Sequence, residues 1–269
     1  GFARAGADVV VASRKLDVCE IAAGEIAAVS GRRVLPVACH VGRWDDAQQL
    51  FDTVYDEFGR CDVLVNNAGM SPVYDDLTSV TEDLYDKVQA VNARGPFRLS
   101  ALFGTAMAEA DGGSIINVTS AGTLRPDTHD LPYVMAKAGL NALTLALAGA
   151  WAPKVRANLV LPGAFDTKMS RAWGAEGQAT AASMNPMKRL GVPEDLAGLC
   201  VFLAYGTTSS VAQLIGAGKR REGLEAGIDG LWLALAIGLL VSVALFAAAR
   251  PLCWAMGARD AVLDNATAY

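Results

Sequence analysis

Residues 120–137 read S-A-G-T-L-R-P-D-T-H-D-L-P-Y-V-M-A-K and follow an apolar run, 114–119, that is typical of a buried strand. Tyr133 and Lys137 are four residues apart, so a helix that begins near Tyr133 places the phenol and the ammonium group on one face. A nearby cation stabilises a phenolate and lowers its pKa from about 10, which makes proton exchange with a carbonyl or an alcohol feasible. The hydroxyl of Ser120 would hold the same oxygen. This pattern predicts a carbonyl/alcohol redox site; the alternative is a simple contact on a helix face.

Composition excludes several classes of protein. The chain has 269 residues, 52% hydrophobic, and is long enough to bury the core of one large α/β domain or two smaller ones. Its net charge of −5, without a dense patch of Lys or Arg, gives no reason to expect nucleic-acid binding. Five cysteines without a C-x-x-C pair predict reduced structural thiols, and two histidines cannot build a histidine-rich metal site. We expect no metal.

Strand and helix patterns alternate along the first three quarters of the chain. Short apolar runs typical of buried strands stand at 8–12, 34–39, 63–65, 115–118 and 155–160. Stretches with helical spacing stand at 16–30, 45–58, 81–107, 133–151 and 193–204. Such alternation predicts an α/β fold with a doubly wound parallel sheet, covered by helices on both faces.

Distinctive residues recur where these strands end. They are Ser13 and Arg14, His40, Asn67-Ala68-Gly69, Ser120, and Pro162-Gly163. Ligands bind at the carboxyl ends of the strands in such sheets, and glycines there let the backbone approach a ligand closely. Each could be ordinary turn chemistry. Their recurrence at one edge of the sheet favours a binding site.

Together these motifs resemble the short-chain dehydrogenase/reductase family. The motifs are N-N-A-G (66–69), Asn92 in V-N-A-R-G-P-F, Ser120, Tyr133 with Lys137, P-G-A-F-D-T (162–167) and R-L-G-V-P-E-D-L-A (189–197). The resemblance covers residues 1–204 and implies a Rossmann-like, NAD(P)-dependent oxidoreductase domain that acts on a small carbonyl or alcohol. Hydride transfer then belongs to the cofactor, and the protein supplies position and a proton.

The resemblance implies a role for each matching residue. Tyr133 would be the general acid/base, Ser120 the hydroxyl that orients the substrate, and Asn92 the holder of a relay water. Lys137 would lower the tyrosine pKa and bind the nicotinamide ribose. The expected cofactor-binding residues are Ser13, Arg14, Lys15, His40, Val41, Asn67, Ala68, Gly69, Tyr133, Lys137, Pro162, Gly163, Phe165 and Thr167.

The end of the first strand predicts the choice of cofactor. An acidic residue there would accept a hydrogen bond from the ribose 2′-hydroxyl of NAD, whereas an arginine would pair with the 2′-phosphate of NADP. The sequence offers Arg14 and Lys15, and its first carboxylate is Asp17. A charge-assisted fork from Arg14 favours NADP over NAD. The alternative is that both cations are solvated charges at a helix start.

Two departures from the family pattern stand in the N-terminal half. His40 occupies a position where the family usually carries an aspartate that faces adenine. The family's first strand and glycine-rich phosphate loop do not precede residue 8. In the order 3-2-1-4-5-6 that strand is central, so we expect the first two strands not to pair with the strand at 63–65. We also expect this chain to bind dinucleotide poorly.

The C-terminal part has another character. We expect a linker at 205–230, a transmembrane helix at 231–249 and a polar tail at 250–269. Residues 231–249 contain no charge, and as a helix they would span about 28 Å, close to the thickness of a bilayer core. Trp232 and Trp254 lie near the two ends. The alternatives are a buried core helix, or a fused or truncated frame whose catalytic residues are a non-catalytic relic.

Location, assembly and substrate contact follow from the same features. The span would attach the protein to a membrane with its catalytic domain in the cytoplasm; without it, the protein would be cytoplasmic. The resemblance implies that the helices at 81–107 and 133–151 pack between subunits of a homodimer or homotetramer. It also implies that residues 169–187 form a mobile lid, with Arg171 and Trp173 over the substrate.

Overall fold

The computed structural model describes residues 1–205. The predicted membrane span and polar tail lie outside the described residues, as does the predicted linker after Tyr205. Within 1–205, one helical stretch, Thr128–Ala150, is long and apolar enough to cross a membrane by length and composition. It carries Tyr133 and packs against the fifth strand, so it is a core helix of the domain.

Five parallel strands form two sheets. They are β1 (Val9–Ser13), β2 (Val34–Ala38), β3 (Val63–Asn66), β4 (Gly113–Val118) and β5 (Val155–Val160). β1 pairs with β2, with Val9 opposite Val34, and β4 lies between β3 and β5. The α/β prediction with parallel sheets is confirmed, and so is the expectation that the first two strands do not pair with β3.

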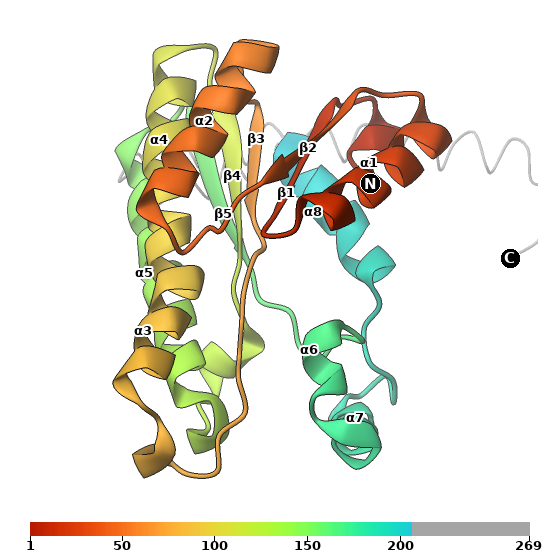
Figure 1. The fold of residues 1–269 in the computed structure, drawn as a ribbon, viewed down its shortest axis with the longest axis vertical. Helices are drawn as coiled ribbons and strands as arrows, with labels where there is room; N and C mark the ends of the chain where they lie inside the picture. The colour runs from red at the N-terminus through yellow and green to blue at the C-terminus, as the bar shows by residue number, and fades with distance from the viewer. Residues whose placement is uncertain (206–269) are drawn as a thin grey trace, which may run out of the picture.

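Helices cover both sides of these sheets (Figure 1). They are α1 (Leu16–Ser30), α2 (Trp44–Phe58), α3 (Glu82–Gln89), α4 (Gly95–Glu109), α5 (Leu131–Ala150), α6 (Lys168–Arg171), α7 (Gly174–Met184) and α8 (Pro193–Tyr205). Helices α2, α4 and α5 lie on one side, and α1 and α8 lie on the other. Short 3-10 turns stand at Ala3–Ala5, Leu77–Ser79, Ala121–Leu124 and Thr128–Asp130.

Two segments differ from the sequence prediction. The single helix expected at 81–107 is interrupted by a π-helical turn, Ala90–Arg94, which contains Asn92. Pro96 follows within the first turn of α4; because proline has no N–H and its ring crowds the carbonyl four residues earlier, a wider turn before it relieves the clash. The expected lid at 169–187 contains the helices α6 and α7.

The hydrophobic core lies on both faces of β4. Ile115 and Ile116 are both fully buried and point to opposite faces. The Ile115 side belongs to a cluster with Leu50 of α2 and Phe103 of α4, and Val10 of β1 and Leu64 of β3 pack against that cluster. One core therefore holds both sheets in a common frame, which positions the strand ends described below.

Candidate active site

Ser120, Tyr133 and Lys137 come together where β4 ends and α5 begins. Ser120 caps the turn Ala121–Leu124, and its Oγ accepts a hydrogen bond from Gly122 N at 3.1 Å. Tyr133 lies in the first turn of α5, and its side chain is hydrogen-bonded to Ser120. The structure thus joins two residues that are separated by a loop, as the sequence analysis predicts.

Lys137 is the least exposed cation of the site. Its side chain is 2% exposed, its Nζ donates to Val118 O at 2.8 Å, and it lies 5.7 Å from the centre of the Tyr133 ring. Burial lowers the pKa of Lys137 to about 8. A charged amine this deeply buried costs stability, so its position favours a functional role over a packing role.

The structure reverses one expectation about Tyr133. We expected Lys137 to lower the tyrosine pKa. Instead, burial raises the pKa of Tyr133; the hydrogen bond with Ser120 acts in the opposite direction, and the charge of Asp130 adds to the rise. The physical reason is that the free-energy cost of removing the phenolate from water exceeds the stabilisation that the nearby groups give it.

Asn92 is fully buried in the π-helical turn and holds the loop after β3. Its Nδ2 donates to Met70 O at 2.8 Å and to Val88 O at 2.9 Å, and its Oδ1 accepts from Met70 N at 3.1 Å. A Cβ on Gly69 would lie 3.0 Å from this Oδ1 and 3.6 Å from Lys137 Nζ. Only glycine leaves the space between Asn92 and Lys137 open.

A buried chain of polar side chains supports the site from below, and sequence reasoning missed it. Asn66 Nδ2 donates to Ser100 Oγ at 3.0 Å and to Asn117 Oδ1 at 2.8 Å. Asn117 Nδ2 donates in turn to Thr144 Oγ1 at 2.8 Å. The chain links β3, β4, α4 and α5. The sequence feature that could have revealed this chain of side chains is an asparagine within each of two apolar strands, where a buried amide without a hydrogen-bond partner would cost stability.

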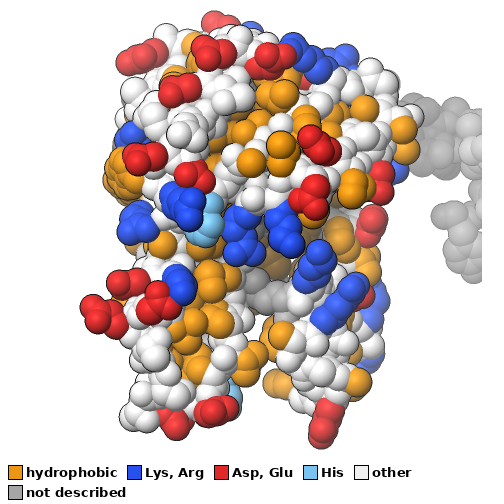
Figure 2. All heavy atoms as spheres, viewed as in Figure 1, with side chains coloured by type: hydrophobic (Ala, Val, Ile, Leu, Met, Phe, Trp, Pro, Cys, Tyr) orange, Lys and Arg blue, Asp and Glu red, His pale blue; other side chains and the backbone are white. Residues whose placement is uncertain are grey.

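The expected nucleotide-binding residues lie at the carboxyl ends of β1 and β2. Ser13, Arg14 and Lys15 are exposed, and neither cation has an ion pair within the described part of the chain. His40 follows β2, and its buried Nδ1 has no hydrogen-bond partner there. Val41 stands against the start of α4, where a Cβ on Gly95 would overlap Val41 O. Lys and Arg side chains gather in a band across the middle of this face (Figure 2).

Asn67, Ala68 and Gly69 are exposed and directly follow β3. They lie at the same edge of the sheet as Ser120, which follows β4. Because the two strands are paired and parallel, the N-N-A-G segment and the proton-transfer residues lie beside each other, as predicted. This juxtaposition leaves the backbone of the three residues accessible to a ligand.

The segment after β5 completes this edge. Pro162 O accepts from Ala121 N at 2.9 Å, and Gly163 is exposed. Phe165 and Gly191 form an isolated parallel β-bridge, whose hydrogen bonds are made by the neighbours of Phe165: Gly191 N donates to Ala164 O, and Asp166 N donates to Gly191 O. The N–H and C=O of Phe165 itself have no partner in residues 1–205. The Oγ1 of Thr167 accepts from Ser170 N at 3.3 Å at the start of α6, and its expected contact with the cofactor stays a prediction.

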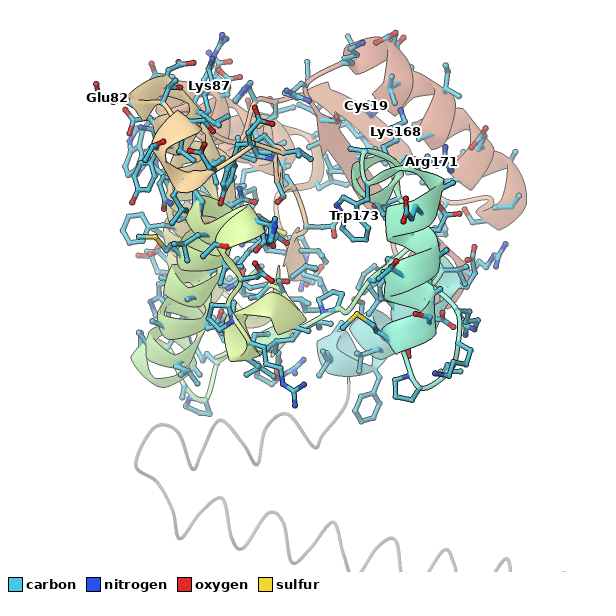
Figure 3. The ribbon with its side chains drawn as sticks, turned by 90° about the horizontal axis from the view of Figure 1, so that it is seen from below. Cys19, Glu82, Lys87, Lys168, Arg171 and Trp173 are labelled. Carbon is cyan, nitrogen blue, oxygen red and sulfur yellow. The ribbon has the colours of Figure 1, made fainter. Side chains whose placement is uncertain are left out.

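The side chains of the α6–α7 segment lie across from α5. Trp173 is 43% exposed and points from this segment into the space between the two sides of the molecule (Figure 3). Arg171 Nε stands 3.6 Å from Asp166 Oδ1 on the same segment. The expected lid over the substrate stays a prediction.

A cavity of about 420 Å³ lies beside the site rather than in it. It is lined by Tyr74, Asp75, Asp76, Leu77, Thr78, Thr128 and His129. The Tyr74 hydroxyl donates to Thr128 O and accepts from Leu131 N, which fastens this loop to the start of α5. A tight crevice with no space for water separates Tyr74 from Tyr133.

The described residues fit most of a dinucleotide. The open space at Gly69 suits a ribose beside Lys137, and Arg14, which has no ion pair in residues 1–205, suits a phosphate. In residues 1–205, no glycine-rich turn leads from a strand into a helix at this edge, so the pyrophosphate lacks the helix N-terminus that commonly holds it. The fit is good at both ends of the dinucleotide and poor in the middle.

Comparison with known proteins gives two family matches. A family model described as enoyl-(acyl carrier protein) reductase matches residues 1–213. A model named MatE matches residues 196–269 and overlaps the first match from within α8 onward. The first match covers the whole described domain.

Individual relatives agree with the first match. Human dehydrogenase/reductase SDR family member 4 is 34% identical over 213 residues, which cover 78% of this chain and 76% of the human protein. A short-chain type dehydrogenase/reductase from Mycobacterium marinum is 32% identical with a TM-score of 0.72, and the match covers 77% of this chain and 82% of that one. NADPH-dependent 3-quinuclidinone reductase from Rhodotorula rubra is 25% identical with a TM-score of 0.70, covering 75% and 76%. The chain belongs to the short-chain dehydrogenase/reductase family of oxidoreductases.

Proposed function

We propose that this domain interconverts a carbonyl compound and a secondary alcohol, with Tyr133 as the general acid/base. The observation that carries this proposal is the buried Lys137 beside Tyr133, with Ser120 hydrogen-bonded to the same phenol. A buried cation that has no carboxylate partner among residues 1–205, next to a titratable phenol at the carboxyl end of a parallel sheet, is typical of a reaction site.

The proposed mechanism assigns one task to each residue. NADP(H), when bound, supplies or accepts the hydride. In the reductive direction, Tyr133 Oη gives its proton to the substrate oxygen as the alcohol forms; in the oxidative direction it takes that proton back. Ser120 Oγ donates a hydrogen bond to the same oxygen and holds it in line with the phenol.

The other two residues act on position and charge. Because burial raises the pKa of Tyr133, the phenol stays protonated at neutral pH and is ready to donate. The ammonium of Lys137, with a pKa of about 8, would stabilise the phenolate that remains after proton transfer. Asn92 keeps the loop at Gly69 and Met70 in place, and the free lone pair of its Oδ1 would accept from a relay water.

We propose NADP as the preferred cofactor. Arg14 and Lys15 follow β1 as exposed cations that have no ion pair in residues 1–205, and a 2′-phosphate would pair with the guanidinium fork of Arg14. The related reductase from Rhodotorula rubra is named NADPH-dependent. Ser13 and His40 would border the adenosine, and the free backbone groups of Phe165 would hold the carboxamide at the other end.

The test of this proposal is Tyr133→Phe. NADPH consumption is followed with a panel of small aliphatic and aromatic ketones, and the variant is compared with Tyr85→Phe, a tyrosine on the exposed side of α3. Loss of a general acid lowers the rate by about 10²–10⁴-fold, whereas the control keeps full turnover. Turnover retained in Tyr133→Phe would reject the assigned mechanism.

A second candidate is a non-catalytic relic that keeps the catalytic residues but holds dinucleotide weakly. The observation that favours it is the separation of β1–β2 from β3–β5. Titration of the 269-residue chain with NADPH, followed by cofactor fluorescence, distinguishes the two. Weak binding favours the relic for this chain, and micromolar affinity would eliminate it.

We further propose that residues 231–249 anchor the protein in a membrane and that the catalytic domain faces the cytoplasm. The support is the uncharged run of nineteen residues and the basic stretch 219–221 before it. The match of 196–269 to a second family model agrees with a change of character in this part of the chain. Alkaline carbonate extraction tests the anchor, and release into the supernatant would count against it.

Assembly into a homodimer or homotetramer is proposed from the surface of α4 and α5. Phe97 of α4 is 49% exposed, and Leu145 of α5 is 69% exposed. Apolar side chains on two adjacent helices suit a subunit interface. Analytical ultracentrifugation in detergent would measure the assembly directly.

A further inference from the structure

Asp130 stands directly before α5 but does not cap this helix. An aspartate at this position usually accepts a hydrogen bond from a backbone N–H of the first helical turn. The side chain of Asp130 makes no such bond, and its backbone angles, φ −139° and ψ 26°, differ from the extended conformation of most cap residues. Leu131 N donates to the Tyr74 hydroxyl instead, at 2.9 Å, and Pro132 has no N–H to offer. The carboxylate of Asp130 is thus not used in capping.

Asp130, Tyr133 and Lys137 form one stripe along α5. Residues three and seven positions apart lie on the same face of a helix, so the phenol stands between the carboxylate and the ammonium group. Lys137 is the buried member, and Asp130 at the start of the helix is only partly buried. Burial raises the pKa of Tyr133, and the charge of Asp130 adds to the rise. The phenol therefore has a cation on one side and a carboxylate on the other.

The surroundings of Asp130 hold no cation that balances its charge. Within residues 1–205, neither the crevice that Asp130 and Tyr133 share nor the neighbouring cavity is lined by a Lys or Arg. The imidazole of His129 is paired with Asp127, with 2.6 Å between Nδ1 and Oδ1. Burial raises the pKa of Asp130, and the charge of Asp127 raises it further. The environment of this carboxylate suits a positively charged partner.

A position at the start of a helix does not by itself account for this carboxylate. The dipole of α5 favours a negative charge there, but a fully exposed carboxylate would have the same benefit. The charge of Asp130 also disfavours the phenolate that proton transfer from Tyr133 leaves behind. In the proposed reaction this effect slows catalysis unless the substrate brings a positive charge that offsets it.

We propose that Asp130 selects amino ketones and amino alcohols, which are substrates with an ammonium group a few atoms from the reacting carbon. The substrate oxygen lies against Tyr133 and Ser120, and the ammonium group lies against the carboxylate of Asp130. This placement rests on the proposed function, whereas the attraction of Asp130 for a cation does not require turnover. The ion pair offsets the charge beside the phenol, so a cationic substrate also makes Tyr133 a better proton donor.

The first experiment measures binding of two matched ketones without any cofactor. The N,N-dimethyl-4-oxopiperidinium ion carries a fixed positive charge, and 4,4-dimethylcyclohexanone has the same shape without the charge. Each ketone is titrated with the full chain in a non-ionic detergent, and broadening of its methyl NMR signal is recorded against detergent alone. We expect the cation to bind about tenfold more tightly. Equal affinity of the two ketones, or binding of neither, would overturn the proposal.

Two carboxylate variants locate the cation. Asp130→Asn keeps the shape of the side chain and removes its charge, so the two ketones should bind equally; Asp130→Glu should keep part of the preference. Asp127→Asn is the matched control, because Asp127 is an exposed carboxylate of the same loop that is already paired with His129. An equal loss of preference in Asp127→Asn would indicate the field of the whole loop rather than contact with Asp130.

Both asparagine variants should fold. Asp130 makes no capping bond that the change could break, and Asn can replace Asp127 as the cap of Thr128–Asp130. Thermal unfolding checks this. A role of Asp130 in the helix dipole alone predicts a lower melting temperature for Asp130→Asn with the preference for the cation intact, and this result would overturn the proposal.

Turnover separates this proposal from the proposed function. NADPH consumption is followed with both ketones, and we expect the ratio of kcat/KM for the cation to that for the neutral ketone to fall by about tenfold in Asp130→Asn. A binding preference that depends on Asp130, with turnover retained in Tyr133→Phe, would support the selection and reject the proposed mechanism. Turnover that depends on Tyr133 but does not distinguish the two ketones would support the mechanism and overturn the selection.

Discussion

The region around β4 and the region around β1 are built from the same parallel-strand pattern but are completed to different degrees. β4 is paired on both sides, its Ile115 and Ile116 are fully buried, and a chain of amides and hydroxyls ties it to α4 and α5. Among residues 1–205, β1 is paired on one side only, and the helix next to it, α1, buries only Cys19 and Ala23. The proposed proton transfer thus lies in the closed β4 region, and the proposed nucleotide binding depends on the open β1 region.

The largest expected difference between the two regions is the loss of unfolding free energy when one strand side chain in each is truncated. Ile116→Ala leaves a cavity beneath the active site and should cost about 2–5 kcal/mol of unfolding free energy. Val11→Ala removes a half-exposed side chain from β1 and should cost about 1 kcal/mol or less. Denaturation followed by circular dichroism measures both. Equal costs would mean that β1 is as well packed as β4.

Lys137→Met tests whether the closed region gives up stability for function. The folded pKa of about 8 lies below the unfolded value, so the unfolded state binds more protons between about pH 8 and pH 10 and stability rises with pH in that window. At pH 7 the buried ammonium carries its full cost. The variant should therefore be about 1–3 kcal/mol more stable at pH 7, with a smaller gain at pH 10, and inactive.

The matched control for that variant is Lys87→Met. Lys87 is exposed and paired with Asp83, so its replacement should change stability little at either pH. A stability gain for Lys137→Met that does not shrink as the pH rises would point to packing rather than charge as the cause.

Arg14→Ala tests whether the open β1 region contributes to nucleotide binding. Loss of the guanidinium should weaken NADPH binding by about tenfold and leave NADH binding unchanged. Arg32→Ala is the control, because Arg32 pairs with Asp8 at the opposite end of the same strand. Calorimetric titration gives both affinities. An equal loss for NADH would show that Arg14 acts without the 2′-phosphate.

The sequence was most informative where a signal is local. The helix expected at 16–30 is observed as Leu16–Ser30, and the strand at 155–160 as Val155–Val160, because apolar periodicity and flanking turns act within a few residues. The i, i+4 spacing likewise brought Tyr133 and Lys137 to one site. Even the separation of the two sheets followed from the expected strand order.

The parts that could not be predicted depend on contacts between distant segments. Asn66 finds Asn117 across two strands, and Asn92 finds Met70 only after a π-helical turn widens the helix. The direction of the Tyr133 pKa shift was wrong for a related reason. It is the sum of burial and nearby groups, and burial is a property of the whole fold.

Amide hydrogen exchange on the full, ligand-free chain tests the contrast between the two regions most directly. If the account is right, the amides of Val10 and Ala12 on the open edge of β1 exchange orders of magnitude faster than those of Ile115 and Ile116 in β4, since only the latter lie in a strand paired on both sides. Equal protection of the two strands would contradict it.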